Sequence, residues 1–513
     1  METLFKIVGI LSAIAASYIS LIKFTHFFQL NSYRAKLQGK WMSQNTSKLI
    51  PNLMFGILGA AAAFLANTFG NIIFIVMMLF GLLLSKPQQA KKPLVYTMRV
   101  KRLLVASTVL FAVIIAVGIL CKQPLITSSI MFLISPFVIM AANIINMPIE
   151  KSINNYYIND AKKMLENSNA VVIGITGSYG KTSLKYFLTT LLKAKFNVLM
   201  TPESFNTPMG IVKTVRQKLN ALHEIFVCEM GAKRVGEIKE ICDIVHPVHG
   251  IITSVGPQHL ETFKSLENIK KTKFELADAL PADGNLFLNV NDENINSYKG
   301  NRKNISYSVN GNGAYNAAVI SVGERGTIFE VTAPDGQTEE FTTKLIGTHN
   351  VLNITGAIAV ANTMGVDFAS LKAQVRKLKS VPHRLELINR GNDIIIDDAY
   401  NANPSGTKAA LETLSCFDGI KILLTPGMVE LGEKQDELNH EFGKNAARIC
   451  DYVILVGRKQ TKSIKSGLEE AGYPDDKTYV ASDLNDALNY AYTINSHNTR
   501  KIILLENDLP DNY

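Results

Sequence analysis

The sequence predicts an α-helical membrane region followed by two α/β lobes, and three features lead to this prediction. First, residues 1–150 contain only two acidic side chains, Glu2 and Glu150, between long apolar runs. Second, short apolar runs alternate with helical patterns over the remaining residues, which is typical of α/β folds. Third, a glycine-rich turn joins an apolar run to a helical pattern within Val171–Ser183. The 513 residues are enough for about three domains.

The composition narrows the class of protein. Hydrophobic residues make up 47% of the chain, and the net charge of +9 comes largely from basic loops in the front part. Basic loops beside apolar runs are typical of the cytoplasmic flanks of membrane spans, so the charge does not indicate a nucleic-acid partner. The five cysteines show no CxxC spacing, which argues against a disulfide framework and a zinc site. A reducing compartment fits this pattern.

We expect residues 1–148 to form a membrane region of about five transmembrane helices. The candidate segments are Leu4–Ile22, two spans within Leu49–Leu84, then Leu103–Cys121 and Leu125–Ile145. A bilayer core requires about 20 apolar residues, and the second and third spans are short, so four or six spans remain possible. With both basic loops in the cytoplasm, the residues after Ile145 are cytoplasmic too. The expected localisation is therefore the cell membrane, multi-pass, with cytoplasmic catalytic domains.

The glycine-rich turn has the chemistry of a phosphate site. Val171–Ile175 predicts a buried parallel strand, and the following helix begins near Lys181. Gly177 and Gly180 let the backbone approach an anion, Lys181 adds a positive charge, and Thr182 can offer its hydroxyl to Mg²⁺. A glycine turn that binds nothing is the alternative, and the GKT sequence at the helix start disfavours it. The sequence therefore predicts a nucleotide site.

Three further segments complete the predicted organisation. Residues 149–169 form a polar helical connector, residues 170–380 a P-loop-type central ATPase domain, and residues 381–513 a Rossmann-like C-terminal domain. Two apolar runs of the central domain end near polar side chains, the first at Glu229 and the second near His259. Open α/β sheets bind their ligands at such strand ends.

Several polar clusters follow the turn in a characteristic order. They are SFNTPMG (204–210), CEMGA (228–232), SVGPQHLETF (254–263), ENIKKTKFELADAL (267–280), GTHNVLN (347–353), HRLEL (383–387), DDAYNANPSG (397–406) and GMVELGE (427–433). Over about Ala170–Val456 this set resembles the Mur ligase family, and most of all its members that join D-alanyl-D-alanine to UDP-muramoyl tripeptide. There are two departures. Apolar runs stand where the family has a UDP-sugar-binding domain, and the chain ends in LLENDLPDNY instead of a KGS-like turn.

The resemblance implies a reaction and a set of site residues. ATP phosphorylates an acceptor carboxylate, and an amine then attacks the acyl phosphate to form an amide. The implied catalytic residues are Lys181, Lys273, His259 and Arg384. The implied ATP-binding residues are Gly177, Ser178, Gly180, Lys181, Thr182, Ser183, His349, Asn350, Asn353, Arg384 and Asp398. The implied Mg²⁺ ligands are Thr182, Glu229, His259 and Lys273, and the implied substrate-facing residues are Asn206, Thr207, Tyr400, Asn401 and Asn403.

Some of these residues have simpler explanations when they are taken singly. Taken alone, Glu229 and His259 would be ordinary loop residues. Only the ordered set of polar clusters favours a role as metal ligands. Asn350 could be a helix cap, and DDAYNANPSG a capping loop. Lys273 fits the KxE spacing of the family lysine that carbon dioxide carbamylates, but Lys270, Lys271 and Lys273 together also fit a solvated helix face.

The leading hypothesis is a membrane-anchored, ATP-dependent carboxylate–amine ligase of peptidoglycan precursor synthesis. Its expected partners are the lipid bilayer, an envelope precursor with a free carboxylate, and an amine donor such as D-Ala-D-Ala. One alternative is a ligase of another envelope polymer, such as poly-γ-glutamate. Another is a P-loop-driven transporter, which the scarcity of charges within the spans disfavours, since Lys6 is the only charged residue in them. A non-catalytic scaffold would have lost its site residues, and this chain has kept them.

Overall fold

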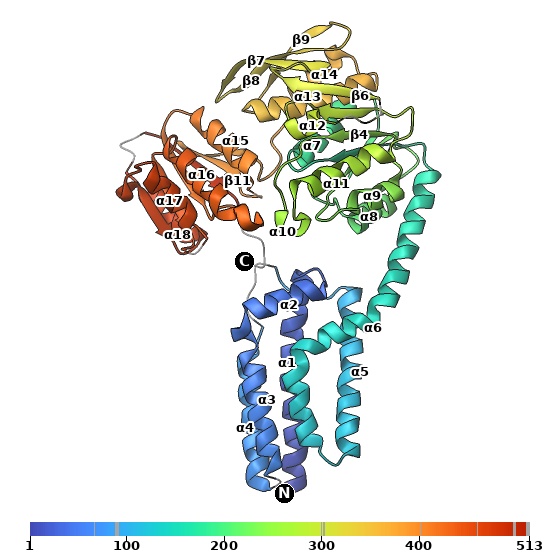
Figure 1. Cartoon of the computed structure of the whole chain (residues 1–513), viewed down its shortest axis with the longest axis vertical. Coiled ribbons are helices and arrows are strands. Elements are labelled where there is room, and N and C mark those ends of the chain that lie inside the picture. Colours follow the sequence, from blue (N-terminus) through green and yellow to red (C-terminus); the bar gives the residue numbers. More distant parts are fainter. Residues whose placement is uncertain are drawn as a thin grey trace. The chain divides into compact units, whose positions relative to one another are not determined.

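The computed structural model describes residues 1–65, 67–87, 92–298, 300, 303–400, 402–458, 460–495 and 499–508. It divides into two compact units, the first up to Tyr156 and the second from Tyr157. The first unit is helical, and the second contains both sheets (Figure 1). We describe each unit by itself.

Six helices and one 3₁₀ turn make up the described part of the first unit. They are α1 (Glu2–Leu30), α2 (Ala35–Gln44), η1 (Thr46–Lys48), α3 (Ile50–Phe64), α4 (Thr68–Leu84), α5 (Met98–Leu120) and α6 (Pro124–Glu166). In length and composition α1, α5 and α6 suffice to cross a membrane, whereas α3 and α4 have only 15 and 17 residues. The five apolar helices therefore lie where five spans were predicted, and the length criterion supports three of them. The fifth predicted span and the predicted connector are one continuous helix, α6.

A buried amide closes a gap in the hydrogen bonding of α6. Pro136 lies inside the helix and has no N–H, so it cannot bond the carbonyl of Phe132, four residues earlier. Asn52 of α3 donates its Nδ2 to that carbonyl at 2.9 Å and to the hydroxyl of Ser20 of α1 at 2.8 Å. Asn52 is 2% exposed. This polar contact joins three apolar helices at a proline.

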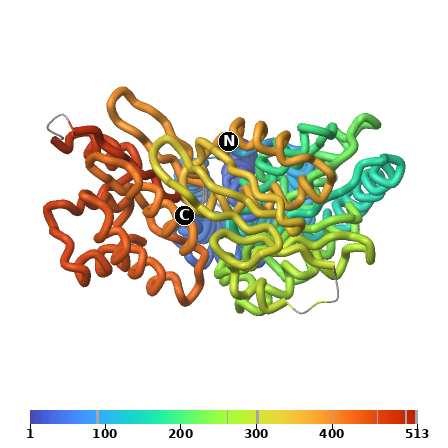
Figure 2. Tube along the Cα trace, turned by 90° about the horizontal axis from the view of Figure 1, so that it is seen from above, coloured from blue at the N-terminus to red at the C-terminus, as the bar shows by residue number. Residues whose placement is uncertain are grey.

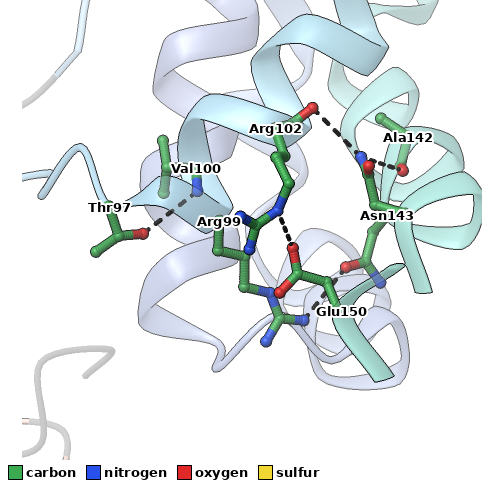
Figure 3. A network of polar contacts seen from close by, with 8 residues as sticks. Thr97, Arg99, Val100, Arg102, Ala142, Asn143 and Glu150 are labelled. Carbon is green, nitrogen blue, oxygen red and sulfur yellow. Dashed lines mark hydrogen bonds and ion pairs between the residues drawn. The ribbon is translucent and has the colours of Figure 1, made fainter. Parts of the chain in front are cut away.

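A second polar network joins α5 to α6 (Figure 3). The Arg102 guanidinium lies 2.7 Å from a carboxylate oxygen of Glu150, and Arg99 donates to the side-chain oxygen of Asn143 at 3.4 Å. Glu150, one of the two acidic residues of the front part, is 8% exposed and paired. The ion pair with Arg102 offsets the free-energy cost of burying the Glu150 charge.

The second unit begins with a nine-stranded sheet in the order β2-β3-β1-β4-β5-β6-β7-β8-β9. Its strands are β1 (Val171–Thr176), β2 (Val198–Met200), β3 (Ile225–Glu229), β4 (His249–Ile252), β5 (Leu286–Asn289), β6 (Asn304–Val309), β7 (Tyr315–Gly323), β8 (Gly326–Thr332) and β9 (Thr338–Thr343). Pairing is parallel from β2 to β7 and antiparallel from β7 to β9. The central strand β1 has β3 on one side and β4 on the other, so the carboxyl ends of these strands meet at one edge.

Helices cover both faces of this sheet, and together they form the first lobe. One face packs against α7 (Lys181–Leu192), α13 (Thr348–Thr363) and α14 (Phe368–Val375). The other packs against α8 (Pro208–Lys218), α9 (Glu237–Val245) and α11 (Leu266–Ala279). Two short helices, α10 (Leu260–Phe263) and α12 (Glu293–Asn296), lie in loops. Burial on both faces explains why β1 reads as an uninterrupted apolar run.

The second lobe is built on a six-stranded sheet in the order β10-β11-β15-β12-β13-β14. Its strands are β10 (Glu386–Arg390), β11 (Asp393–Asp398), β12 (Ile420–Thr425), β13 (Tyr452–Val456), β14 (Thr478–Ala481) and β15 (Lys501–Glu506). One face packs against α15 (Pro404–Ser415), α16 (Gln435–Ala447) and α17 (Lys462–Glu470), and the other against α18 (Leu484–Thr493). Two 3₁₀ turns, η2 (Gly432–Lys434) and η3 (Asp475–Lys477), lie in loops. Only β10 is antiparallel, and Figure 2 shows this lobe in orange and red.

Candidate active site

The turn between β1 and α7 requires glycine at two positions. Gly177 and Gly180 have φ angles of 151° and 80°, which side chains disfavour. A Cβ atom on Gly177 would lie 2.0 Å from the hydroxyl of Thr253, and one on Gly180 would lie 2.7 Å from the side-chain oxygen of Asn353. Helix α7 begins at Lys181. The predicted strand, turn and helix are therefore confirmed, and Asn353 of α13 lies against the turn.

The Lys181 ammonium lies over this turn. Its Nζ donates to the carbonyl of Gly177 at 2.6 Å and to that of Ser178 at 3.0 Å. Burial lowers the pKa of Lys181 to about 8, an effect that nearby Glu229 opposes and Arg384 reinforces. A lysine with carbonyl partners and low solvation is suited to bind a phosphate group.

Glu229 lies at the carboxyl end of β3 and contacts three side chains. Its Oε1 accepts hydrogen bonds from the Thr182 hydroxyl and from the Asn206 amide, each at 3.1 Å. Its Oε2 lies 3.0 Å from the ammonium of Lys185. Burial raises the pKa of Glu229, but Lys185 and Lys181 outweigh this effect and hold it below its ordinary value. Glu229, 1% exposed, is thus an ionised carboxylate inside the protein.

Lys185 is a site residue that the sequence analysis missed. It is 0% exposed and lies one helical turn after Lys181 on α7. Residues four apart share one face of a helix, so a second lysine at this spacing was the available signal. Its partners are the Glu229 carboxylate and the carbonyl of Glu203.

We predict that Lys185→Met destabilises the protein by about 3 kcal/mol, because it leaves the buried Glu229 charge without its ammonium. Urea unfolding followed by the fluorescence of a nucleotide-site probe measures this loss. Lys193→Met is the matched control, since Lys193 is exposed at the end of the same helix and should leave the midpoint unchanged. The double variant Lys185→Met/Glu229→Leu should recover part of the loss. Equal midpoints for Lys185→Met and the parent would contradict the prediction.

The residues at this edge fit a magnesium ion. Mg²⁺ prefers oxygen ligands, and the Thr182 hydroxyl and Glu229 carboxylate stand 3.1 Å apart. Glu229 Oε2 is buried, and within the described part of the chain it has no hydrogen-bond donor of good geometry, although Lys185 Nζ is close to it. The oxygen set therefore suits a hard cation beside the phosphate turn.

His259 follows β4 and lies at the start of α10 with a left-handed φ of 51°. Its Nδ1 lies 2.6 Å from Oε2 of Glu430 in the second lobe. Burial lowers the pKa of His259, and the hydrogen bond from His259 holds the pKa of Glu430 at about 2. Glu430 is a second residue that the sequence analysis did not single out, although it lies within the GMVELGE cluster.

Lys273 differs from its lysine neighbours on α11. It is 2% exposed, whereas Lys270 is half-buried and Lys271 is exposed. Burial lowers the pKa of Lys273 well below its ordinary value, and the charge of Lys181 lowers it further. Among the described residues Lys273 makes no ion pair, and its Nζ lies 6.0 Å from the Phe263 ring centre. The solvated-face explanation is therefore wrong for Lys273, which has the properties of a neutral amine.

The other residues predicted to bind nucleotide around the turn differ in their burial and in their hydrogen-bond partners. His349 is partly buried at the start of α13, which lowers its pKa to about 4. Asn350 donates to the carbonyl of Ile346 at 2.9 Å. The Ser178 hydroxyl donates to the Gly256 carbonyl at 3.0 Å, and Ser183 lies on the first turn of α7.

In the second lobe, Arg384 stacks on Tyr400, with 4.4 Å between its Cζ and the ring centre. The charge of Arg384 lowers the pKa of both Lys181 and Asp398, so Arg384 lies near the phosphate turn as well as the end of β11. Burial nevertheless raises the pKa of Asp398 to about 6. Asp398 pairs in register with Glu506 of β15, which is 0% exposed. Burial raises the pKa of Glu506, and the charge of Asp398 raises it further. Glu506 belongs to the LLENDLPDNY segment, where a KGS-like turn was expected, and it forms an acid pair with Asp398.

The predicted substrate-facing residues do not form one cluster. Asn206 contacts Glu229. Thr207 caps α8 by accepting from the Gly210 N–H at 3.4 Å, and Asn403 caps α15 by accepting from the Gly406 N–H at 2.8 Å. Tyr400 is 46% exposed, and Asn401 lies outside the described residues. The helix-capping explanation is confirmed for Asn403.

Comparisons with known families match both lobes. Residues 175–361 match the Mur ligase middle domain, and residues 383–505 match the Mur ligase, glutamate ligase domain. The chain is 32% identical to the UDP-N-acetylmuramoyl-tripeptide–D-alanyl-D-alanine ligase of Escherichia coli over 321 residues, which cover 61% of this chain and 70% of that protein. It is 33% identical to the Bacillus subtilis enzyme of the same name over 55% of this chain and 62% of the relative.

Among solved structures, MurF ligases are similar to this chain. MurF from Acinetobacter baumannii aligns with a TM-score of 0.62 at 25% identity, over 69% of this chain and 77% of that one. MurF ligase from Thermotoga maritima, solved in complex with ADP, aligns with a TM-score of 0.60 at 27% identity, over 69% and 80% of the two chains. The chain thus spans about two thirds of the length of its curated relatives, and somewhat more of these structures.

Proposed function

Because the chain belongs to the Mur ligase family, we propose that it is a membrane-anchored ligase that joins an amine to a carboxylate-bearing peptidoglycan precursor. Members of this family are ATP-dependent ligases that form C–N bonds. The observation that carries the proposal is the cluster at the edge of the first sheet, where Lys181, Thr182 and Glu229 meet. The substrates that we consider are those in the names of the relatives, a muramoyl tripeptide and D-Ala-D-Ala.

The proposed reaction has two steps. An oxygen of the acceptor carboxylate attacks the γ-phosphorus of ATP, and the bond from phosphorus to the bridging oxygen of ADP breaks. The nitrogen of the amine donor then attacks the acyl carbon and loses a proton, and phosphate leaves with the former carboxylate oxygen. One amide, one ADP and one phosphate result from each turnover.

In this proposal the first lobe binds the phosphates. The N–H groups of the turn and the Lys181 ammonium bind β- and γ-phosphate oxygens, where negative charge develops during transfer. Thr182 and Glu229 would hold Mg²⁺, with His259 as a further ligand. The ion, when bound, neutralises charge on the transferred phosphoryl group.

We also propose that Lys273 is carbamylated. A neutral amine adds carbon dioxide and loses a proton, which converts the side chain into an anion with two oxygen atoms. The burial and lowered pKa of Lys273 favour the amine form that this reaction requires. The resulting oxygens would suit Mg²⁺ better than the ammonium would.

The second lobe supplies Arg384 and Asp398 in this proposal. Arg384 binds phosphate oxygens through a fork of N–H donors, and Asp398 accepts from the ribose of the nucleotide. Because Arg384 belongs to a different lobe from Lys181, closure of the two lobes completes the site and excludes water.

We infer that the apolar helices anchor the enzyme in the cell membrane and that both lobes lie in the cytoplasm. Three of these helices have the length and composition of membrane spans. The basic loops between the helices favour the cytoplasmic side. Cytoplasmic ATP would then reach the site directly.

Cysteine labelling in cells tests this orientation. Cys121 is exposed at the end of α5, and with five spans and both basic loops in the cytoplasm this end of α5 faces outward. Cys416 is half-buried in the second lobe. A membrane-impermeant maleimide should label Cys121 in intact cells and Cys416 only after permeabilisation. Cys121→Ser and Cys416→Ser variants identify the labelled residue. Labelling of Cys416 in intact cells, or of Cys121 only after permeabilisation, would contradict the orientation.

An anchored enzyme is suited to an acceptor that is itself held at the membrane. Two molecules on one membrane meet at raised effective concentration, which for short tethers reaches about the millimolar range. We therefore propose a lipid-linked or membrane-proximal acceptor. Full-length protein in vesicles, supplied with ATP and D-Ala-D-Ala, should extend extracted lipid-linked precursors faster than free UDP-muramoyl tripeptide, as measured by mass spectrometry. Faster extension of the free nucleotide-linked tripeptide would contradict this and leave the helices as a simple anchor.

Neither alternative function gains support. The reported relatives are ligases of muramoyl peptides, and both lobes match Mur ligase domains. A transporter or a poly-γ-glutamate ligase is therefore not proposed.

A further inference from the structure

One carboxylate of the second lobe contacts a histidine and a lysine of the first lobe. Oε2 of Glu430 lies 2.6 Å from Nδ1 of His259, and Oε1 of Glu430 lies 3.6 Å from Nζ of Lys233. Glu430 and His259 are 171 residues apart in sequence. The contact therefore exists only when the two lobes are together.

The loop that carries Glu430 is built rigidly. Buried Asn439 accepts from the N–H of Met428 at 2.8 Å and donates to the carbonyl of Met428 at 2.9 Å. Asn507 donates to the carbonyl of Gly427 at 2.6 Å. The neighbours Val429 and Leu431 are 6% and 3% exposed, whereas the Glu430 side chain is 31% exposed. The loop is thus fixed to its own lobe, and the Glu430 side chain extends from it to His259 and Lys233.

Both partners hold unusual backbone conformations. Glu430 and His259 have φ angles of 62° and 51°, in the left-handed region that residues with side chains rarely adopt. Such conformations persist only where surrounding contacts impose them, and they concentrate at functional sites. Here the two strained residues face each other in one hydrogen bond.

The hydrogen bond decides which ring nitrogen of His259 is available. A carboxylate only accepts hydrogen bonds, so Nδ1 carries the proton that is donated to Glu430. The lone pair of the neutral ring then lies on Nε2. Ligating histidines in proteins commonly have a carboxylate on the other ring nitrogen, which fixes the tautomer and the orientation of the ring.

We propose that Glu430 is a positioning residue that links lobe closure to the cation site. It holds His259 in the tautomer whose Nε2 can bind a divalent cation, and Lys233 keeps the Glu430 carboxylate in place. This inference rests on the proposed function, since it takes His259 as a ligand of the nucleotide-bound cation. It adds a residue from the opposite lobe to that site.

Mn²⁺ binding to the full-length protein tests the role of Glu430. Mn²⁺ is titrated in the presence of a non-hydrolysable ATP analogue and followed by electron paramagnetic resonance. Glu430→Gln and Glu430→Ala should weaken Mn²⁺ binding about tenfold or more, a typical effect of losing such a partner. Binding of the analogue without metal should stay unchanged. Glu437→Gln, an exposed position on the following helix, is the matched control.

A double-variant cycle separates positioning from general stability. In a His259→Ala background, Glu430→Gln should cause no further loss of Mn²⁺ affinity, because its effect acts through His259. Mn²⁺ affinities within twofold of the parent for both Glu430 variants, or a full additional loss in the His259→Ala background, would overturn the inference. If the parent binds Mn²⁺ as expected but forms no amide, the proposed function fails and this inference stands. Absence of Mn²⁺ binding to the parent overturns both.

Discussion

Lys181→Ala should reduce ligation by about 10³-fold or more at saturating ATP, because the transferred phosphoryl group loses its direct positive contact. The ammonium lies over the phosphate turn, within hydrogen-bond distance of two of its carbonyls. Negative charge gathers at this point in the transition state, so the loss falls on the rate constant of the chemical step as well as on ATP affinity. Phosphate release with acceptor and amine present measures the effect.

Lys193→Ala is the matched control for this variant, because Lys193 is exposed at the end of the same helix. It should leave the rate unchanged. Near-parental turnover by Lys181→Ala at saturating ATP would show that the turn does not act on the phosphates.

Lys273→Ala should lose activity by at least about 100-fold, since the proposed carbamate supplies oxygen atoms to the cation beside the transferred phosphate. The same assay measures this loss. A short carboxylic acid such as formate should partly restore Lys273→Ala, because it can bring the missing carboxylate-like group into the vacated space. Lys271→Ala, an exposed position on the same helix, should keep parental activity.

A second measurement checks the modification itself. Carbon-13 NMR of the parent protein in ¹³C-bicarbonate should show a carbamate signal that is absent from Lys273→Ala. Unimpaired turnover by Lys273→Ala, or a bare amine in the active parent enzyme, would contradict carbamylation.

The parts of the fold that sequence reasoning found are those with strong local signals. The buried strand β1, the turn and the start of α7 at Lys181 were predicted from a β-branched run, from Gly177 and Gly180, and from the GKT sequence at the helix start. Strands β3 and β4 also lie on the two apolar runs that were predicted to end at Glu229 and near His259. Strands such as β2, β10 and β14 are short or half-polar, and tertiary pairing defines them more than their own sequence does.

The parts of the site that could not be predicted depend on long-range contacts. The i, i+4 spacing from Lys181 places Lys185 on the same helix face, but its burial and its pairing depend on Glu229, 44 positions later on another element. The Glu430 contact joins two lobes, and the Asp398–Glu506 pair joins two strands that are distant in sequence. By contrast, the KxE spacing pointed to Lys273, and its burial supports that choice over Lys270 and Lys271.

The central claim is that the chain forms an amide through an acyl phosphate, and oxygen transfer tests this most directly. Full-length protein in vesicles is given ATP, D-Ala-D-Ala and extracted precursor whose acceptor carboxylate carries ¹⁸O. Our account predicts one ¹⁸O atom in each phosphate released, together with one new amide and one ADP, as measured by mass spectrometry. Amide formation with unlabelled phosphate, or ATP hydrolysis without any amide, would contradict it.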